Sequence, residues 1–540
     1  MNIISAILLS TILIAAEQPK QKHEASSQKK SVTEWKFFDA NTFVSTIAND
    51  GPFNDWRRTG SGGLLWPKGE QSCAVFTSGL VLVGRHRPSN NLRTSVQYFF
   101  TEFQPGPIIG TFNTSTNDPS VSADKTDSTY RIYKISKGDT ELTNPDYADW
   151  PGDLGAPYID INANGLWDKG TDTPQLYGDQ TLWQVINDLD TAAHRTLGTT
   201  APMGIEVHAM YYGFDRPGAL GNAMFLKWKI INKSDAHYDS TFIGIFSDVD
   251  MGNGGDDYDG YDTTLSLAYV YNADNDDAGE YGYGSTPPSV GTVILGGSPG
   301  LLPYAYPVWV KGGFTGLYND WNTGQKIFPQ EVFNYSSGVT KMGTPIIDPL
   351  TGQPVRFAFT GDPVTNQGWT KENTEYFIPA DVRSYVSLGP VTLASGDTQE
   401  VNAALVIARS TDRLSSLTLL RQYTDYVRSA YNNNFITSVR QNVALPVGFH
   451  LEQNYPNPFN PSTTVRFSIQ ERSIVSLTIF NTLGQSVAAA SPGLVEAGYH
   501  EYRFDASHLP SGVYLYRLSG RRWGQNGESF SDAKKMLLIK

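Results

Sequence analysis

Residues 462–480 read STTVRFSIQERSIVSLTIF, and apolar residues alternate with polar ones along two short runs of this stretch. Side chains of a β-strand point alternately to opposite faces, so each run predicts a strand with one buried face. Turn residues at 481–484 (NTLG) and 510–512 (PSG) separate these runs from the later ones. The stretch therefore predicts a small antiparallel sandwich over residues 449–540. The alternating apolar residues are Val465, Phe467, Ile469, Val475, Leu477 and Ile479.

The same signal extends through the rest of the 540-residue chain. Aromatic residues make up 12% of it and charged residues only 18%, and it contains 51 Gly and 31 Pro. Aromatic residues fit half-buried pleated surfaces, whereas Gly and Pro occupy turns. This balance predicts a mainly β protein with a large, β-sandwich-rich central region over residues 36–447. Strand-like alternation recurs at 74–83, 95–103, 205–212, 224–231, 241–247 and 265–271.

One stretch of the central region has the periodicity of an amphipathic helix. Asp412 is a good N-cap residue, and apolar residues follow it at three- and four-residue spacing from Leu414 to Val427. Residues 385–408, just before the helix, predict paired strands joined by a Gly-Asp turn. A chain of this length usually forms more than one domain. A boundary inside the central region is therefore expected near residue 330.

The first 35 residues have the character of an export signal and a leader. The apolar run from Ile3 to Ala16 has the length of a signal-peptide core and is short for a membrane span. We therefore expect a signal peptide over residues 1–16, a flexible leader over 17–35 and a mature chain without a transmembrane segment. No Lys or Arg precedes the apolar run, which leaves a cytoplasmic N-terminal strand as the alternative.

The C-terminal part carries four specific motifs: NYPNPFNP at 454–461, the Leu483-Gly484 turn, LPSGVY at 509–514 and a Lys-rich last strand. With these motifs, residues 449–540 resemble the type A C-terminal sorting domain of the type IX secretion system. The resemblance implies an immunoglobulin-like sandwich that engages the type IX secretion machinery. It also implies export through the periplasm to the cell surface or the extracellular medium. Residues 521–532 depart from the family pattern and are expected to lengthen a hairpin.

Four runs of the central region resemble uncharacterised exported proteins that carry the same tail. These runs are 178–190, 227–235, 246–272 and 387–417. The resemblance implies secretion and a β-rich fold, and it transfers no activity and no site residue.

Charge and cysteine content exclude several classes of function. The net charge is −13, whereas a protein that binds nucleic acid needs a clustered basic surface. Cys73 is the single cysteine, so the chain forms no internal disulfide and no thiolate metal cluster. A lone cysteine of this kind is expected to be a buried small apolar residue.

The run DINANGLWD at 160–168 predicts a calcium loop. Calcium needs several hard oxygen ligands, and alternate Asp and Asn side chains in a tight loop bring them to one point. Gly165 at the sixth position permits the sharp turn, and Leu166 at the seventh offers its backbone carbonyl. The twelfth position is Thr171 rather than the Glu of an EF-hand, and a metal-free Asx turn is the alternative. The candidate ligands are Asp160, Asn162, Asn164, Leu166 and Asp168.

A second candidate metal site lies in an acidic segment that contains no Lys or Arg from residue 248 to residue 280. Asp248 and Asp250 lie on one side of a strand end, and three later carboxylates are placed to fold back onto them. Such a charge density repels itself unless it is solvated or neutralised by a cation. The alternative is a solvated acidic loop. The candidate ligands are Asp248, Asp250, Asp256, Asp257 and Asp262.

The sequence contains no persuasive catalytic motif. Residues 296–300 match G-x-S-x-G, but Pro299 has no N–H for an oxyanion hole, so this run predicts a turn. The eight histidines are not spaced as a helical zinc site. We therefore expect no catalytic or cofactor-binding residue apart from calcium ligands.

These observations favour an exported, calcium-stabilised adhesin, binding or scaffold protein that engages a polysaccharide or a cell-envelope partner. The alternative is a secreted, glycan-active hydrolase that uses Asp/Glu pairs, whose separation in a cleft decides such chemistry. A purely structural component of the cell envelope is a third possibility.

Overall fold

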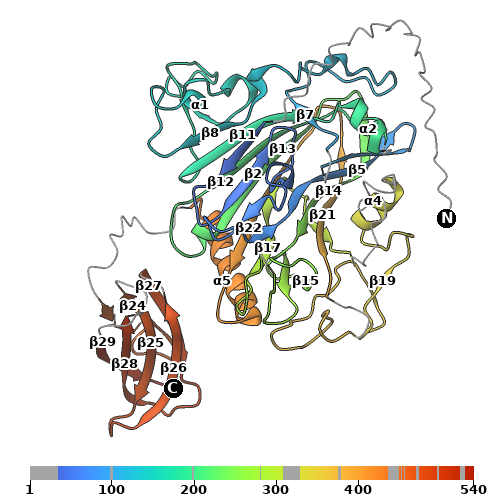
Figure 1. Ribbon diagram of the computed structural model, residues 1–540. Coiled ribbons are helices and arrows are strands. Elements are labelled where there is room, and N and C mark those ends of the chain that lie inside the picture. Colours follow the sequence, from blue (N-terminus) through green and yellow to red (C-terminus); the bar gives the residue numbers. More distant parts are fainter. Residues whose placement is uncertain are drawn as a thin grey trace, which may run out of the picture.

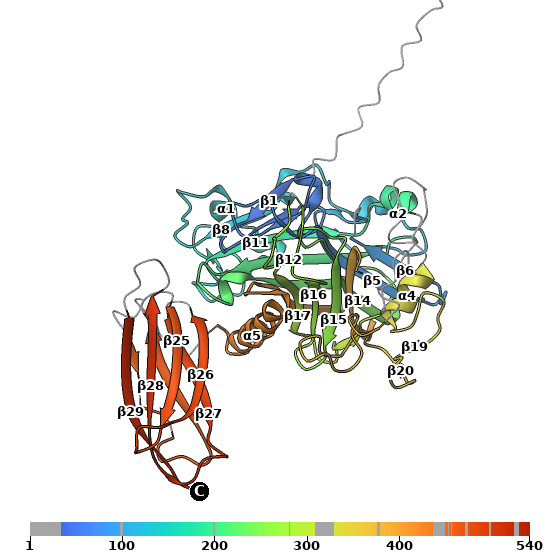
Figure 2. The ribbon, with the colours of Figure 1, turned by 60° about the horizontal axis from the view of Figure 1, so that its bottom comes forward.

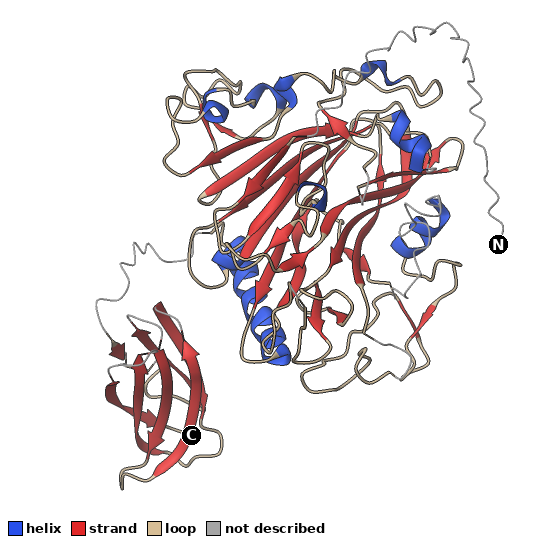
Figure 3. Cartoon of the chain, viewed as in Figure 1, coloured by secondary structure: helices blue, strands red, loops and turns tan. Residues whose placement is uncertain are grey.

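A computed structural model describes residues 34–97, 101–197, 200–279, 281–307, 329–374, 379–435, 449–451, 453–454, 456–469, 473–495, 498–522 and 529–540 (Figure 1). The expected signal peptide, and the expected leader as far as residue 33, lie outside these residues. Strands dominate the described chain and helices are few, as Figure 3 shows, which confirms the predicted mainly β class. Within the described residues, no helix is both long and apolar enough to cross a membrane.

The larger of the two main sheets of the central region has nine strands, which run in the order β15-β16-β17-β22-β13-β12-β11-β7, with β8 also pairing with β11. Every strand pair in it is antiparallel. Its strands are β7 (Gln104–Pro105), β8 (Tyr133–Ser136), β11 (Gln180–Asn187), β12 (Ile205–Gly213), β13 (Ala223–Asn232), β15 (Asp257–Asp262), β16 (Leu267–Asn272), β17 (Ser289–Gly297) and β22 (Thr398–Ala408).

The second main sheet has five strands in the order β18-β21-β14-β5-β6. They are β5 (Thr77–Arg87), β6 (Leu92–Val96), β14 (His237–Val249), β18 (Pro303–Ala305) and β21 (Val382–Leu393). A four-stranded sheet of β1 (Trp35–Phe38), β2 (Val44–Ala48), β3 (Leu64–Leu65) and β4 (Cys73–Val75) precedes them in the chain. Two short hairpins are formed by β9 (Tyr158–Ile159) with β10 (Thr173–Pro174), and by β19 (Ile346–Ile347) with β20 (Pro354–Val355).

Period-two alternation assigns the strand residues to separate layers. Along β12, Val207 and Tyr211 enter the core shared with the five-stranded sheet, whereas Met210 belongs to a cluster on the opposite face. On β14, Ile243 and Ile245 face that shared core, and Phe246 joins a cluster on the outer face. The two main sheets therefore pack as a sandwich, with a further apolar layer on each outer face.

Helices provide much of these outer layers (Figures 1 and 2). The helix α5 (Arg413–Asn432) packs Leu417, Leu420 and Val427 on the outer face of the nine-stranded sheet. Asp412 caps it, since its carboxylate accepts from the N–H groups of Leu414 and Ser415, which confirms the predicted helix start. On the five-stranded sheet, α4 (Pro329–Ser336) contributes Val332 and Tyr335.

The remaining helical elements are short. They are α1 (Pro145–Ala148), α2 (Thr191–Leu197), η1 (Trp56–Arg58), η2 (Pro119–Val121), η3 (Ser128–Tyr130), η4 (Gly152–Leu154) and η5 (Leu220–Asn222).

The prediction of paired strands at 385–408 is wrong in its pairing. Both strands exist, but β21 pairs with β14 in the five-stranded sheet, whereas β22 pairs with β13 and β17 in the nine-stranded sheet. The turn between them crosses from one layer of the sandwich to the other instead of closing a hairpin. Because β21 and β22 join strands from before residue 300, both main sheets continue across position 330.

The C-terminal residues form a smaller sandwich of a three-stranded sheet, β23-β24-β27, and a four-stranded sheet, β26-β25-β28-β29. The alternating apolar residues of β24 and β25 are buried in its core, which confirms the strand prediction there. The buried ring of Phe459 lies in the NYPNPFNP motif, whose backbone bonds to Leu537 and Ile539 at the final strand. The strands are β23 (His450–Leu451), β24 (Ser462–Ile469), β25 (Ser473–Phe480), β26 (Ser486–Val495), β27 (Gly498–Asp505), β28 (Gly512–Arg522) and β29 (Ser529–Leu538).

Candidate functional site

The hairpin of β9 and β10 holds the first candidate metal site, because it closes residues 160–172 into a loop. Ile159 pairs with Thr173 and Tyr158 pairs with Pro174 at its base. Ala163 and Gly165 take positive φ angles of 57° and 79°, which turn the chain sharply back. The residue order Asx-x-Asx-Ala-Asx-Gly therefore forms a compact loop, here called the 160–172 loop.

The predicted ligands of this loop converge. The Asp168 carboxylate accepts from the Asn162 amide at 2.8 Å and from the Asn164 amide at 2.6 Å, both to the same oxygen, Oδ2. Asp160 Oδ2 accepts from the backbone N–H of Gly165 at 2.7 Å. The Leu166 side chain is 67% exposed, and its N–H donates to Asn164 Oδ1. Four polar side chains thus surround the centre of one exposed loop.

Asp172, which the sequence analysis did not select, fixes the two ends of the loop. It is buried, and its carboxylate accepts from the N–H groups of Ile161 at 2.9 Å and Asp168 at 2.8 Å. The sequence signal for it was weak, because it stands at the thirteenth position, one residue beyond the twelfth position of a calcium loop. Its hydrogen bonds hold the shape of the loop from within the protein.

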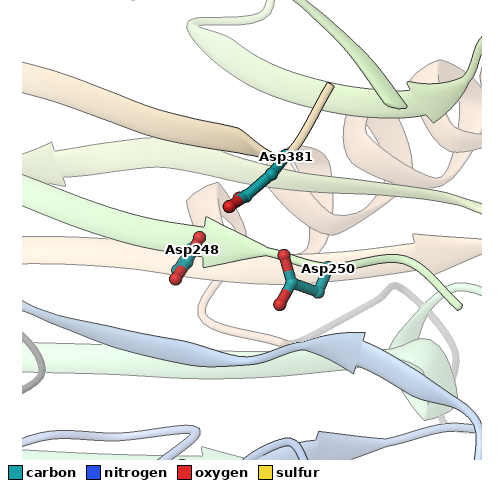
Figure 4. A group of neighbouring side chains, drawn as sticks. All are labelled: Asp248, Asp250 and Asp381. Carbon is teal, nitrogen blue, oxygen red and sulfur yellow. The ribbon is translucent and has the colours of Figure 1, made fainter. Parts of the chain in front are cut away.

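The second site is assembled by strand pairing. On β14, Asp248 lies opposite Arg383 of β21, and Val249 lies opposite Val382. The same antiparallel register, continued by one residue, sets Asp250 opposite Asp381. Carboxylate oxygens of Asp248, Asp250 and Asp381 all lie within 4.8 Å of one another, and Figure 4 shows them side by side at the end of β14. These residues are called the three-aspartate group.

The three-aspartate group is short of positive charge. Arg383 Nε lies 3.4 Å from Asp248 Oδ1, and its Nη1 donates to Asp381 Oδ1 at 2.7 Å. Burial raises the pKa of Asp248 well above its usual range, and the negative charges of Asp250 and Asp381 add to this against the opposing effect of Arg383. Burial, followed by the charge of Asp381, raises the pKa of Asp250 to about 6. The arrangement therefore favours neutralisation of at least one carboxylate, by a proton or by a cation.

The structure places the other predicted ligands of the acidic segment differently. Asp257 is fully buried next to the group, where its Oδ2 accepts from the N–H of Met251 at 3.1 Å, and burial raises its pKa well above the usual range. Asp256 is half-buried and accepts from the Asn253 amide at 3.2 Å. Asp262 stands at the far end of β15, where it caps a turn by accepting from Thr264 and Leu265. Only Asp248 and Asp250 of the predicted set enter the three-aspartate group.

Sequence reasoning missed Asp381 because its partners are far away along the chain. It precedes β21, and only the pairing of β21 with β14 brings it to Asp248 and Asp250. Nothing in the run around residue 381 resembles a ligand motif. Asp381 could be found only from the register of β21 against β14.

Two residues that have reactive chemistry elsewhere are structural in this fold. Burial raises the pKa of the Cys73 thiol well above its usual range, and the nearby charges of Asp250 and Asp248 raise it further, so Cys73 stays a protonated thiol. Ser298 of the G-x-S-x-G run lies in a turn, where its hydroxyl accepts from the N–H of Glu400 at 2.8 Å. The prediction of a turn is therefore confirmed for residues 298–300, whereas Gly296 and Gly297 still belong to β17.

Comparison with known proteins identifies the C-terminal tail. Residues 453–525 match the family model of the secretion system C-terminal sorting domain. The protein is therefore exported to the cell surface or the extracellular medium, and its tail interacts with the type IX secretion machinery. No curated protein matches the chain.

One solved structure that resembles the chain is a polysaccharide lyase. The match covers 62% of this chain and 34% of the lyase, at 9% sequence identity and a TM-score of 0.18. This chain thus spans about a third of the length of that protein. A likeness as weak as this carries no argument about either the fold or the activity of the central region.

Proposed function

We propose that the central region is a calcium-stabilised adhesin, binding or scaffold protein that the type IX secretion system delivers to the cell surface. The observation that carries this proposal is the 160–172 loop. Its Asp and Asn side chains are hydrogen-bonded to one another and to the loop backbone, and a buried carboxylate, Asp172, fixes both of its ends.

The ligand chemistry of the loop suits calcium. Calcium takes six to eight oxygen ligands at about 2.3–2.6 Å, from carboxylates, amide carbonyls, backbone carbonyls and water. Asp160 and Asp168 supply negative charge, and Leu166 offers its backbone carbonyl. The amides of Asn162 and Asn164 donate N–H groups to Asp168, and their carbonyl oxygens accept from the backbone N–H groups of Asn164 and Leu166. A bound calcium ion would replace part of these hydrogen bonds within the loop.

The location of the protein agrees with a modest calcium affinity. Calcium loops of extracellular modules bind with dissociation constants of about 0.1–1 mM, because calcium is abundant outside cells. A ligand bound only by the folded state raises stability by mass action. Calcium binding outside the cell would therefore add to the stability that the hydrogen bonds of the loop already provide.

Exposed apolar residues around the 160–172 loop suggest a binding surface that calcium would hold in place. Ile159, Ile161 and Leu166 are all at least half exposed around the loop. Fixing this loop in one conformation presents them together, as a binding surface for a polysaccharide or a cell-envelope partner requires.

Thermal unfolding of the full chain, in millimolar calcium and then in chelator, tests the proposal. Calcium should raise the melting temperature by several degrees in the wild type. The double variant Asp160→Asn/Asp168→Asn should lose the part of this rise that the loop contributes. Asp153→Asn removes an exposed carboxylate from outside the loop and should keep the full rise. An equal rise in the double variant and the wild type would contradict the assignment of the loop.

A further inference from the structure

The end of β14 holds more negative charge than the protein itself neutralises. Asp248 and Asp250 lie two residues apart on one strand, so their side chains project to the same face. The register of β14 with β21 adds Asp381 across the ladder. Like charges directly opposite each other in a sheet are destabilising, and among the described residues only Arg383 is ion-paired with the members of this group.

Burial makes this excess charge costly. Asp248 is only 1% exposed, and its Oδ1 accepts no hydrogen bond from any described residue. The nearest cation to that oxygen, Arg383 Nε, stands 3.4 Å away, beyond the length of a normal charged hydrogen bond. Asp257 lies next to the group, is fully buried, and likewise has an Oδ1 without a hydrogen-bond donor in the described chain. A buried carboxylate left in this way must be neutralised, by a proton or by a further cation.

We infer that Asp248, Asp250 and Asp381 form a divalent-cation site, with calcium as the ion, which ties the end of β14 to the start of β21. This inference adds a second calcium site to the one proposed above. It rests on the positions of Asp248, Asp250 and Asp381 and does not depend on the 160–172 loop.

The spacing of the oxygens matches one shared ion. Two ligand oxygens that each lie about 2.4 Å from a calcium ion are at most about 4.8 Å apart. The oxygens of all three carboxylates meet this condition together. The three carboxylates already face one another, so small side-chain rotations would bring their oxygens onto one ion.

The donor set selects the class of ion. Three carboxylates and no His or Cys favour a hard cation over zinc or copper. Asp381 is 39% exposed, so the group opens to solvent on that side, and water completes the coordination there. Calcium tolerates irregular coordination of this kind, whereas magnesium demands a near-ideal octahedron.

The test counts calcium ions bound by the full chain, with isothermal titration calorimetry and calcium chloride as the probe. The variant Asp250→Asn/Asp381→Asn removes two ligands while keeping the side-chain shapes and leaving the most buried ligand, Asp248, intact. Asp256→Asn/Asp262→Asn is the matched control, because it removes two carboxylates of the same acidic segment outside the group. Asp160→Asn/Asp168→Asn reports the 160–172 loop separately.

The wild type and the matched control should bind two ions, and each of the other two variants should bind one. The affinity of the affected site should fall at least about tenfold, because calcium affinity is set by ligand charge. In chelator, Asp250→Asn/Asp381→Asn should melt at or above the wild-type temperature, since it relieves repulsion, and in calcium it should melt below it. This crossover distinguishes a cation site from carboxylates that only pack.

Three results would overturn the inference. If Asp250→Asn/Asp381→Asn binds as many ions as the wild type, the three-aspartate group is not a site, and the proposal for the loop is unaffected. If the wild type binds one ion and loses it only in Asp160→Asn/Asp168→Asn, the second site is absent as well. A wild type that binds no calcium contradicts both the inference and the proposed function.

Discussion

The 160–172 loop and the three-aspartate group solve one problem, the gathering of oxygen ligands, in opposite ways. The loop takes its ligands from nine consecutive residues, lies on the surface and keeps its polar atoms bonded to one another. The three-aspartate group takes its ligands from the ends of two paired strands, and Asp248 and Asp381 are 133 residues apart in the sequence (381 − 248). Asp248 is almost fully buried. Without an ion, the polar groups of the loop still have hydrogen-bond partners. Without an ion or an added proton, the carboxylates of the three-aspartate group repel one another.

The two sites differ in how calcium binding would stabilise the protein. In the loop, calcium replaces hydrogen bonds between neighbouring side chains, so the net change in stability is modest. In the group, a cation removes repulsion inside a low-dielectric environment, where each interaction is stronger than in water. Calcium should therefore stabilise the group more than the loop.

The largest effect is expected from Arg383→Met, which removes the cation whose Nε lies 3.4 Å from Asp248. Breaking a buried ion pair on one side costs about 3–5 kcal/mol, because a charge is left buried without its partner. Urea unfolding in chelator should show this loss, and calcium should restore part of it. Arg87→Met is the control, since its ion pair with Asp239 is exposed, and it should cost at most about 1 kcal/mol. If calcium does not reduce the loss of stability in Arg383→Met, the three-aspartate group does not differ from the loop in the way proposed here.

The next effect concerns Glu102, a buried carboxylate that is already matched by a positive charge. His194 Nδ1 lies 3.0 Å from Glu102, and its Nε2 lies 2.9 Å from the Asp188 carbonyl. Losing these charged hydrogen bonds in His194→Gln should cost about 2 kcal/mol. Calcium should not alter this loss, because the pair needs no added cation. Urea unfolding with and without calcium measures both.

The His194–Glu102 pair also predicts a pH dependence. Burial has the largest single effect and lowers the pKa of His194, but the charge and hydrogen bond of Glu102 and those of Asp188 together outweigh it, so the pKa is raised from the usual 6.5. The stabilisation is therefore complete below pH 6.5 and is lost as the pH rises through the raised value. Unfolding of the wild type from pH 6 to pH 9 should show this decline, and His194→Gln should flatten it. A steeper decline in the variant would contradict the assignment.

A smaller effect is expected at the turn of the loop. Gly165 has a φ of 79°, and an added Cβ would meet no neighbouring atom, so Gly165→Ala costs only the strain of a left-handed backbone, about 1 kcal/mol. The same substitution should weaken calcium binding to the loop while leaving the three-aspartate group unaffected. Calcium titration of the variant checks both statements, and a loss at the second site would show that the two sites are coupled.

The smallest effect is expected at Asp262. This residue caps a turn, and Asn caps as well as Asp. Arg421 Nε lies 3.4 Å from its carboxylate but keeps its closer ion pair with Asp362, so Asp262→Asn should change the free energy of unfolding by only about 0.5 kcal/mol. Its calcium response should equal that of the wild type. A reduced response would place Asp262 in a metal site after all.

The strands and the capped helix could be predicted because their signals are local. Alternation located β12, β13 and β14 to within a few residues, except at the N-terminal end of β14, and Asp412 marked the start of α5. The Asx-rich loop was visible for the same reason, since all its ligands lie in one run. Asp172 was the exception, because its role depends on a carboxylate that points back into the hairpin.

Strand pairing could not be predicted in the same way. A Gly-Asp turn between two alternating runs is as compatible with a crossing between sheets as with a hairpin, and β21 and β22 take the crossing. That choice sets the register of β21 against β14, and the register alone brings Asp381 to Asp248 and Asp250. The three-aspartate group therefore depends on whether β21 and β22 form a hairpin or cross between sheets, and the local sequence pattern does not decide this.

Long-wavelength anomalous diffraction from a crystal of the full chain grown in calcium would test the central claim most directly. The account predicts one anomalous peak within the 160–172 loop and a second peak between Asp248, Asp250 and Asp381. Each peak should have ligand oxygens at about 2.3–2.6 Å. A map with no peak at either position, at saturating calcium, would contradict the claim that calcium stabilises this protein.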